Sequence, residues 1–469
     1  MKRVLLFVSI LLAATIGLSA CGTQEPLPAE TVVVTQIVQG TPETVVVTQI
    51  VPGTPEIVVV TPTPEPGQEG APTVIRVGTG DGGEGLTPHQ QIIQNFEDEN
   101  PEILVQLEAV AGRDYYARLL TQLAAKAAPD IMQIGDDAVP SFVEKGAFIP
   151  LDDLIAQESF DTSIYLPGLL EPGQVDGKQY LLPKDYSPLG VYYNKKIFDA
   201  AGVAYPQDGW TWDDLLATAQ QLTKDENGDG TPEIWGIQLP ATWTTGFEYW
   251  VGAAGGKLIS EDGKSFVGYM DSPEVIRAVQ FYADLYNEYN VAPPPTDLNQ
   301  FGGGNSEFAN GQAAMQIFGR WPQSGLKKNP NVDLGVAPPP QDSVRANVLF
   351  WGGFGVSSTT NAPEETFKFL SFYAGEPGAQ VWKDWALPAV KSVAESSGLT
   401  EDPIEGVWIN ELNHLVPRAY LFTPYWNETA DPALRKALET VLLDPTADVA
   451  TVMQQAAQEA QAALDKLIQ

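Results

Sequence analysis

From residue 73 onward, the chain alternates between segments with strand-like and helix-like spacing of apolar positions. Thr73–Val77 predicts a strand, His89–Glu99 predicts a helix that ends at Asn100-Pro101, and Ile103–Glu108 predicts a second strand. A strand, a helix and another strand in this order form a βαβ unit when the two strands are parallel. The pattern therefore predicts an α/β fold that begins at residue 73.

The alternation continues further along the chain. Tyr115–Ala128 has the spacing of a helix, Asp130–Ile134 that of a strand, and Asp136–Gly146 that of a loop followed by a helix. The part after residue 72 is longer than one typical domain, so we expect two α/β lobes.

The first 20 residues follow a different pattern. Lys2 and Arg3 precede the apolar stretch Val4–Leu18, which is shorter than the roughly 20 residues that a membrane-spanning helix needs. The next residues, Ser19-Ala20-Cys21, complete a segment that resembles a bacterial lipobox. The resemblance implies that residues 1–20 are a lipoprotein signal peptide and that Cys21 carries the lipid. The alternative is an ordinary secretory signal beside a chance cysteine.

Residues 21–72 form a low-complexity segment. The sequence TVVVTQIVQGTPE at 31–43 recurs as TVVVTQIVPGTPE at 44–56 and again in part from Ile57. Copies this short and rich in proline cannot bury a core, so we expect a semi-extended tether. At roughly 3.1 Å per residue, its ~50 residues would reach about 160 Å. Pairing of the valine-rich copies as strands is the alternative.

Composition narrows the functions that the chain can have. Lys and Arg number 26 against 60 Asp and Glu, so the formal net charge is −34. Such acidity argues against nucleic acid and anionic lipid headgroups as partners, and a solvated acidic surface that keeps the protein soluble is its simplest meaning. With a single cysteine, no disulfide can form within the chain.

Several carboxylates lie where an open α/β sheet places its ligand groups, beyond the carboxyl ends of strands. Asp136 and Asp137 follow the strand that ends at Ile134, although a helix N-cap is an equally simple role for each. Two more acidic residues follow the first strand, and two further candidates lie on a segment that Pro183 and Pro188 keep extended. These four candidates are Asp81, Glu84, Asp185 and Tyr186.

Tryptophans supply the second kind of candidate, because aromatic faces pack against the C–H faces of sugars while carboxylates bind their hydroxyls. Trp212 and Trp382 lie in helical patterns and are expected in the core. Other tryptophans stand in loops beside Gly or Pro, where they could contact a solute instead of packing in the core. These are Trp243, Trp321, Trp351 and Trp426.

A separate loop, DENGDGTPE at 225–233, has the alternating oxygen ligands of a calcium loop. Asp225, Asn227 and Asp229 resemble positions 1, 3 and 5 of an EF-hand loop, and Gly230 occupies the turn position. Thr231 would supply a backbone carbonyl. Residue 236 is Gly where an EF-hand has Glu, so Glu233 would have to complete the shell. We expect structural Ca²⁺ here, with no cofactor for function, and a bare Asx-rich turn is the alternative.

The order and spacing of several longer segments resemble the extracellular solute-binding proteins of family 1, the sugar-binding lipoproteins of ATP-binding-cassette (ABC) importers that are similar to maltodextrin-binding proteins. These segments are APDIMQIGDDAVPSFVEKGAFIPLDDLI at 128–155, LPKDYSPLGVYYNKKIFDAAGV at 182–203, GWTWDDLLATAQQLT at 209–223, GGNSEFANGQAAMQIFGRWP at 303–322, LGVAPPP at 334–340, WGGFGVSS at 351–358 and LPAVKSV at 387–393.

The resemblance implies a two-lobe, periplasmic-binding-protein-like α/β fold of type II, hinged by several chain crossings, that closes on its solute. Lobe 1 would comprise 73–185 and 350–390, and lobe 2 would comprise 186–349 and 391–469. Arg320-Trp321 falls where the family places an aromatic ring against the sugar, and Trp426 falls at a second such place.

What the resemblance implies for function is capture of a carbohydrate, most simply an oligosaccharide, outside the cytoplasm. The partners would be the permease subunits of an ABC transporter and, through the lipid on Cys21, the outer face of the cell membrane. We expect a monomer without enzymatic activity. The alternatives are a surface carbohydrate-active hydrolase, because paired carboxylates and aromatic grooves also serve hydrolysis, and a binding protein for a non-sugar solute. His89 and His414 are too far apart in the sequence for an H-E-x-x-H metal site.

Overall fold

The computed structural model describes residues 72–112, 114–295 and 306–468, all of which belong to one unit, Gln68–Gln469. The predicted signal peptide, Cys21 and nearly all of the predicted tether lie outside the described residues. Among the residues described, no helix is long and apolar enough to span a bilayer.

The expected βαβ start is confirmed. β1 (Thr73–Thr79) and β2 (Ile103–Ala109) are parallel and in register from Thr73 opposite Ile103, and α2 (Leu86–Glu99) connects them. Helix α2 ends where Asn100 and Pro101 predict, because proline disfavours a helical conformation in the residue before it.

One mixed sheet runs through the described residues in the order β2-β1-β3-β10-β6-β8-β7, and β9 and β11 also pair with β6. This confirms the α/β class. The remaining strands of the sheet are β3 (Ile131–Gly135), β6 (Leu181–Asn194), β7 (Trp235–Gln238), β8 (Ala313–Gly319), β9 (Leu334–Ala337), β10 (Leu349–Val356) and β11 (Leu387–Pro388). A separate hairpin comprises β4 (Gln174–Val175) and β5 (Lys178–Gln179).

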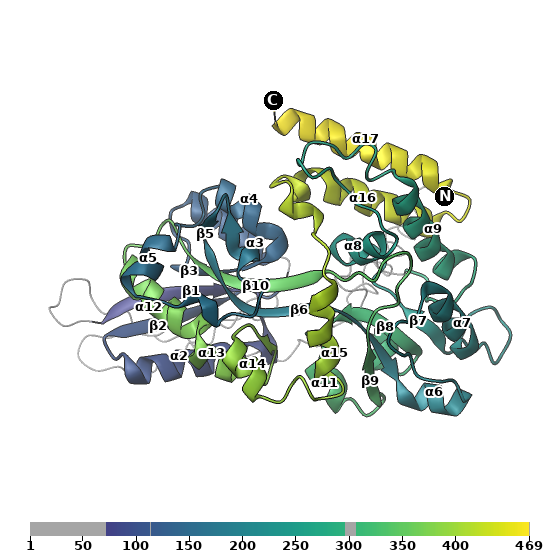
Figure 1. Cartoon of the computed structure of the whole chain (residues 1–469), viewed down its shortest axis with the longest axis horizontal. Coiled ribbons are helices and arrows are strands. Elements are labelled where there is room, and N and C mark those ends of the chain that lie inside the picture. The colour runs from purple at the N-terminus through teal and green to yellow at the C-terminus, as the bar shows by residue number, and fades with distance from the viewer. Residues whose placement is uncertain (1–71, 113, 296–305, 469) are drawn as a thin grey trace, which may run out of the picture. The chain divides into compact units, whose positions relative to one another are not determined.

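Strand β6 connects two parts of the sheet (Figure 1). Its first part pairs with β10 up to Pro188, and from Leu189 onward it pairs with β8 and β9. Pro183 and Pro188 keep this segment extended, as the sequence predicts. We call the part with β1, β2, β3 and β10 the first half and the part with β7, β8 and β9 the second half.

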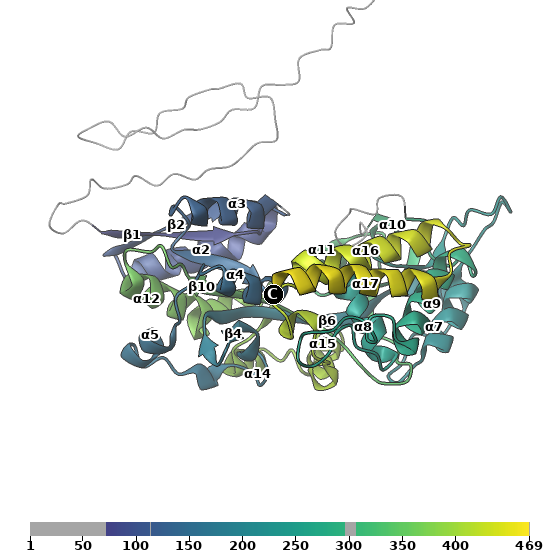
Figure 2. The same ribbon diagram turned by 90° about the horizontal axis from the view of Figure 1, so that it is seen from above.

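Helices cover both halves. In the first half, α2 packs with α12 and α13, and the rings of Phe96 and Phe369 meet edge to face at 4.9 Å. In the second half, α16 and α17 lie side by side and α16 also packs on α8 and α9 (Figures 1 and 2). The other helices are α3 (Asp114–Ala124), α4 (Val139–Glu144), α5 (Asp152–Gln157), α6 (Lys195–Ala201), α7 (Trp212–Leu222), α8 (Thr244–Ala253), α9 (Pro273–Asn287), α10 (Ser306–Ala309), α11 (Gln323–Lys328), α12 (Pro363–Ala374), α13 (Glu376–Trp382), α14 (Lys391–Ser396), α15 (Glu405–Asn410), α16 (Trp426–Leu443) and α17 (Val449–Leu467).

Local sequence explains where these helices begin and what they bury. Helix α7 begins with a capping box, in which Thr211 accepts from the backbone N–H of Asp214 and the Asp214 side chain accepts from that of Thr211. Trp212 then stacks on Phe281 at 4.7 Å, and Trp382 is also buried. The prediction that Trp212 and Trp382 belong to the core is therefore confirmed.

Candidate functional site

Two of the predicted carboxylates, Asp136 and Asp185, lie on either side of strand β10. Gly352 of β10 lies opposite Gly135 on one side and Asp185 on the other. Because neighbouring strands lie about 4.8 Å apart, Asp136, which follows Gly135, and Asp185 lie roughly 10 Å apart across β10. Asp81 follows β1 in the same half.

Asp81 and Asp185 share one buried cation, Lys184. Its Nζ lies 3.3 Å from Asp81 Oδ2 and 3.2 Å from Asp185 Oδ2. The lysine is almost wholly buried and sits over the ring of Trp382 at 4.4 Å, whereas the two carboxylates are 32% and 24% exposed. Each carboxylate therefore has surface left with which to bind a solute hydroxyl.

His89 forms hydrogen bonds with Asp81 and with Tyr373. Its Nε2 lies 2.8 Å from Asp81 Oδ2 and its Nδ1 lies 2.6 Å from the hydroxyl of Tyr373. Burial lowers the pKa of His89, so the ring is neutral, donates from Nε2 and accepts from Tyr373. Burial would raise the pKa of Asp81, but Lys184 and His89 together lower it below its ordinary range. We name Lys184, Asp81, Asp185 and His89 the Lys184 cluster.

A second buried cation, Arg418, binds the other predicted carboxylate. Arg418 Nη1 donates to Asp136 Oδ2 at 3.1 Å and to the carbonyl of Leu349 at 2.9 Å. Its Nη2 donates to the carbonyl of Thr245 and to Glu248 Oε1, both at 3.2 Å, and its Nε donates to the same Glu248 oxygen at 3.2 Å. All five N–H donors of a guanidinium thus have an acceptor.

Both carboxylate oxygens of Asp136 also accept hydrogen bonds from within the protein. Its Oδ1 accepts from the backbone N–H of Trp351 at 3.2 Å, and its Oδ2 accepts from Arg418 and from the hydroxyl of Tyr420. The side chains of Arg418, Asp136 and Glu248 are only 2%, 4% and 6% exposed. We name Arg418, Asp136, Glu248 and Tyr420 the Arg418 cluster. These contacts leave Asp136 little surface for a solute.

Asp137 differs from its neighbour. It is partly exposed and forms no ion pair with any described residue. Burial and the adjacent charge of Asp136 raise the pKa of Asp137 to about 6, with a smaller contribution from Asp431 and an opposing one from Arg418. Asp137 therefore keeps its hydrogen-bonding capacity available at the end of β3.

Four aromatic side chains gather in the second half and at the start of β10. Trp243 stacks on Phe350 at 4.8 Å, and the ring of Trp321 meets those of Trp243, Phe318 and Phe350 edge-on at 5.8, 5.0 and 5.6 Å. Trp321 remains 44% exposed. We name these four residues the aromatic cluster. Phe350 also lies against Arg418, whose guanidinium carbon is 4.7 Å from the ring centroid, so the two clusters are adjacent.

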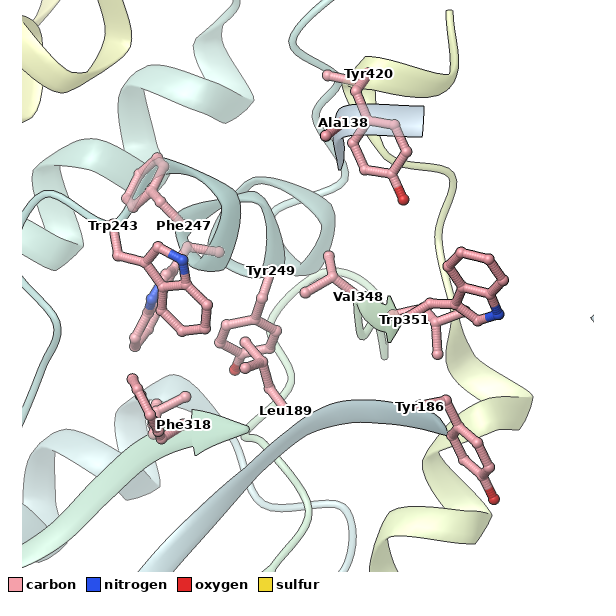
Figure 3. Close-up of a cluster of buried hydrophobic side chains, with 14 of the residues drawn as sticks. Ala138, Tyr186, Leu189, Trp243, Phe247, Tyr249, Phe318, Val348, Trp351 and Tyr420 are labelled. Carbon is pink, nitrogen blue, oxygen red and sulfur yellow. The ribbon is translucent and has the colours of Figure 1, made fainter. Parts of the chain in front are cut away.

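The side chains of Trp351 and Tyr186 lie away from the aromatic cluster. They lie opposite each other on β10 and β6, and Figure 3 shows both away from Trp243 and Phe318. Trp351 is 3% exposed and its Nε1 donates to the carbonyl of Leu169 at 2.8 Å. Tyr186 is buried, and no residue of the described part accepts from its hydroxyl. The structure thus places both in the core beside the carboxylates.

Three other candidates lie apart from this arrangement. Trp426 begins α16 and is 1% exposed, and Glu84 is exposed in the 3₁₀ turn Gly83–Gly85. Arg320 is buried, with its Nε 2.7 Å from Glu405 Oε2 and its Nη1 3.1 Å from the carbonyl of Trp385. Its guanidinium therefore holds α15 and the α13–β11 connection.

The candidate calcium loop is held together by its own side chains. The two oxygens of Asp225 accept from the backbone N–H groups of Gly228 and Gly230 at 2.7 and 2.9 Å, and Glu233 accepts from Asn227 Nδ2 at 2.6 Å. Gly228 and Gly230 have positive φ angles, as tight Asx-rich turns require. No group of three or more His, Cys, Asp or Glu side chains among the residues described is arranged to hold a metal ion. The residues are of the type that Ca²⁺ binds, but this arrangement favours hydrogen bonds within the loop.

Sequence reasoning missed Glu248, Arg418, Tyr420, Phe350 and Gly352. A Cβ on Gly352 would lie 2.8 Å from Asp185 Oδ1, so glycine leaves room for that carboxylate. The Trp-Gly-Gly run at 351–353 is the one local signal that could have found it. Glu248 lies inside α8, where its burial has no local signature.

Comparison with known proteins agrees with this architecture. The profile of the family described as bacterial extracellular solute-binding protein matches residues 91–405. A putative binding protein of Brucella abortus is 26% identical over 395 residues, which cover 80% of this chain and 90% of that protein.

Two solved structures share the fold. The ABC substrate-binding protein Lmo0181 from Listeria monocytogenes, in complex with cycloalternan, has 27% identity and a TM-score of 0.74 and covers 85% of this chain and 99% of its own. An ABC transporter solute-binding protein from Thermotoga lettingae, bound with α-D-tagatose, has 25% identity and a TM-score of 0.72 and covers 84% and 100%. With a family match over most of its length and a two-lobe fold shared with these proteins, the chain belongs to the bacterial extracellular solute-binding protein family.

Proposed function

We propose that this protein captures a neutral carbohydrate between its two halves and delivers it to the permease of an ABC importer. The observation that carries this proposal is the pairing of partly exposed carboxylates with an exposed indole. Asp81, Asp137 and Asp185 would accept from sugar hydroxyls, while Trp321, backed by Trp243, would cover an apolar sugar face.

Carbohydrate is favoured over other solutes for two reasons. The partly exposed carboxylates of the candidate site, Asp81, Asp137 and Asp185, are acidic, which disfavours the binding of phosphates and other anions. The Listeria relative is in complex with cycloalternan and the Thermotoga relative is bound with α-D-tagatose. A hydrolase is disfavoured because the family consists of binding proteins.

The predicted site is refined accordingly. We retain Asp81, Asp137, Asp185 and Trp321 as solute contacts, and Trp243, which is buried behind Trp321, as the support of that ring. We assign Trp351, Trp426, Tyr186 and Arg320 to packing, and Asp136 to the Arg418 cluster, because each is buried and Asp136 and Arg320 are also bonded within the protein. Glu84 has no described partner that would orient it, so it stays a prediction.

A thermal-shift panel tests the proposal. The purified protein would be heated with mono-, di- and oligosaccharides, and with a peptide, a polyamine and a phosphate ester for comparison. A ligand that binds only the folded state raises the melting temperature by mass action. A shift with one class of neutral sugar is expected, and a shift with only a non-sugar solute would contradict the substrate class.

We also propose that the protein is anchored by a lipid on Cys21 and held at the outer face of the membrane by the 21–72 tether, as a monomer. The signal-like residues 1–20 and the lipobox-like tetrapeptide support this. Cys21→Ser should move the protein from the membrane fraction to the soluble extracytoplasmic fraction, and continued membrane association would contradict the anchor. We keep the lobe division at 185/186, 349/350 and 390/391 as part of the proposal.

A third proposal concerns the 225–233 loop, where Ca²⁺ would bind Asp225, Asn227, Asp229, Glu233 and the Thr231 carbonyl and stiffen the turn. The alternating oxygen side chains, which are of the type that Ca²⁺ binds, support it. A chelator should then lower the melting temperature and Ca²⁺ should restore it. If neither the chelator nor Ca²⁺ changes the melting temperature of the wild type, the loop is a turn held by its own hydrogen bonds and the calcium proposal is wrong.

A further inference from the structure

Arg418 is fixed to the second half of the molecule. The backbone N–H of the next residue, Ala419, donates to Glu248 Oε2 at 2.7 Å, and the Arg418 side chain donates to Glu248 and to the carbonyl of Thr245. Glu248 and Thr245 both lie in α8, which follows β7 and packs on α9 and α16. Arg418 therefore moves with α8.

The same guanidinium also reaches the first half. Its Nη1 donates to Asp136 Oδ2 at 3.1 Å and to the Leu349 carbonyl at 2.9 Å, and Tyr420 donates to the same Asp136 oxygen. Asp136 follows β3, which pairs with β10 and β1. One arginine thus joins a helix of the second half to a strand end of the first.

No donor of Arg418 remains for a solute, because all five have acceptors in the protein. Asp136 is likewise surrounded by three donors. A buried ion pair that uses its full hydrogen-bonding capacity constrains the geometry of the elements that carry it. The constraint here acts between the two halves.

A line of more exposed contacts continues outward from this pair. The hydroxyl of Tyr425 donates to Glu144 Oε1 at 2.6 Å, and Lys145 Nζ lies 3.1 Å from Glu428 Oε1. Residues 418–428 thus touch residues 136–145 from a buried inner end to a solvated outer end. The buried inner end is expected to dominate, since exposed ion pairs contribute little.

We propose that Arg418 is a positioning residue for solute capture, which ties Asp136 of the first half to α8 of the second and so sets how often the halves are closed before solute binds. This inference rests on the proposed capture of solute between the halves. Apparent affinity falls in proportion to the fraction of molecules in the binding-competent state, so a residue that never touches solute can change it.

The test compares two isosteric variants that each weaken one arm of the same guanidinium. Asp136→Asn weakens the arm to the first half, and Glu248→Gln weakens the arm within the second half. Small-angle X-ray scattering of the full chain would give the radius of gyration without sugar and with a saturating sugar from the thermal-shift panel, and stopped-flow tryptophan fluorescence would give the association and dissociation rates.

Asp136→Asn is expected to enlarge the sugar-free protein, to leave the saturated protein unchanged, and to weaken apparent affinity roughly tenfold through slower association, because fewer molecules are in the binding-competent state. Tyr420→Phe, which removes only a hydroxyl from Asp136, should act in the same direction by a smaller factor. Glu248→Gln should lower the melting temperature while leaving the sugar-free radius of gyration as in the wild type.

Two outcomes overturn the inference. If Asp136→Asn weakens binding with no change in the sugar-free dimensions, Asp136 contacts the solute directly. If both isosteric variants open the protein equally, Arg418 stabilises the fold without linking the halves in particular. The scattering comparison without sugar stands even if no sugar in the panel binds, so failure of the proposed function is distinguishable from failure of this inference.

Discussion

Two buried cations lie near strand β10, and each binds two carboxylates, yet their surroundings differ. The carboxylates of the Lys184 cluster, Asp81 and Asp185, are about a third and a quarter exposed, and both belong to the first half. Those of the Arg418 cluster, Asp136 and Glu248, are almost wholly buried and belong to different halves. The same set of charges can therefore face a solute in one place and join two parts of the fold in another.

The type of cation also differs between the partly exposed Lys184 cluster and the buried Arg418 cluster. The lysine ammonium uses two carboxylates and an aromatic face and leaves the outer oxygens of its partners available. The planar guanidinium has five fixed donors and satisfies acceptors from several elements at once. Exposure of the partner carboxylates, more than the charges themselves, separates a binding cluster from a structural one.

The largest effect should come from removing each cation. Arg418→Met leaves two buried carboxylates unpaired and should lower the free energy of unfolding by about 3–5 kcal/mol. Lys184→Met leaves carboxylates that water can reach and should lower it by only about 1–3 kcal/mol. Urea denaturation followed by tryptophan fluorescence measures both. Lys145→Met, at an exposed ion pair, is the control and should stay within about 0.5 kcal/mol. Equal losses of unfolding free energy in Arg418→Met and Lys184→Met would contradict the distinction between the two clusters.

Next in size is the effect of Trp321→Ala on binding. Trp321 is the exposed member of the aromatic cluster, so its loss should weaken sugar affinity about 30-fold, equivalent to roughly 2 kcal/mol. Titration calorimetry with the best sugar from the panel measures it. Wild-type affinity in this variant would remove the aromatic cluster from the site.

Gly352→Ala tests the space beside the Lys184 cluster. A new Cβ would lie 2.8 Å from Asp185 Oδ1 and 3.4 Å from Lys184 Cε, so Asp185 must shift. Overpacking of this kind should destabilise the protein by about 1–2 kcal/mol and weaken sugar binding several-fold. Gly325→Ala in α11 is the matched control, since its Cβ would meet nothing within 4 Å and alanine favours a helix. If both variants bind sugar as the wild type does, Asp185 is not a solute contact.

The smallest effect concerns Asp137 and pH. Its pKa is raised from 3.8 to about 6, so the folded state binds more protons than the unfolded state between these values. Stability from this group is therefore greatest at low pH and is lost as pH rises from about 4 to 6. Asp137→Asn should abolish that decline and be more stable than the wild type at pH 8 by about 1 kcal/mol after screening. Melting temperatures from pH 4 to 8 measure it, and parallel curves for the two proteins would refute the account of this carboxyl.

The strand-end rule accounts for what the sequence predicts well. Asp81 and Asp136 could be located because each follows a short apolar strand, and Asp185 could be located because it lies on the β6 crossing that Pro183 and Pro188 keep extended. Their division between two cations could not be predicted, because it depends on Arg418, which lies more than 280 residues from Asp136 in the sequence.

The tryptophans show the same limit. A proline or glycine follows both Trp321, which is exposed, and Trp351, which is buried and donates to the carbonyl of Leu169. Trp351 lies inside β10, opposite Tyr186 of β6, whereas Trp321 follows the end of β8, and the sequence does not show this difference.

The central claim is that the carboxylates of the Lys184 cluster accept hydrogen bonds from the hydroxyls of a captured sugar. Isothermal titration calorimetry of one neutral oligosaccharide into the wild type and into Asp185→Asn tests this claim most directly. The account predicts measurable binding to the wild type and roughly tenfold weaker binding to the variant, with the melting temperatures of the sugar-free proteins nearly equal. Unchanged affinity in Asp185→Asn, or binding of only anionic solutes by the wild type, would contradict it.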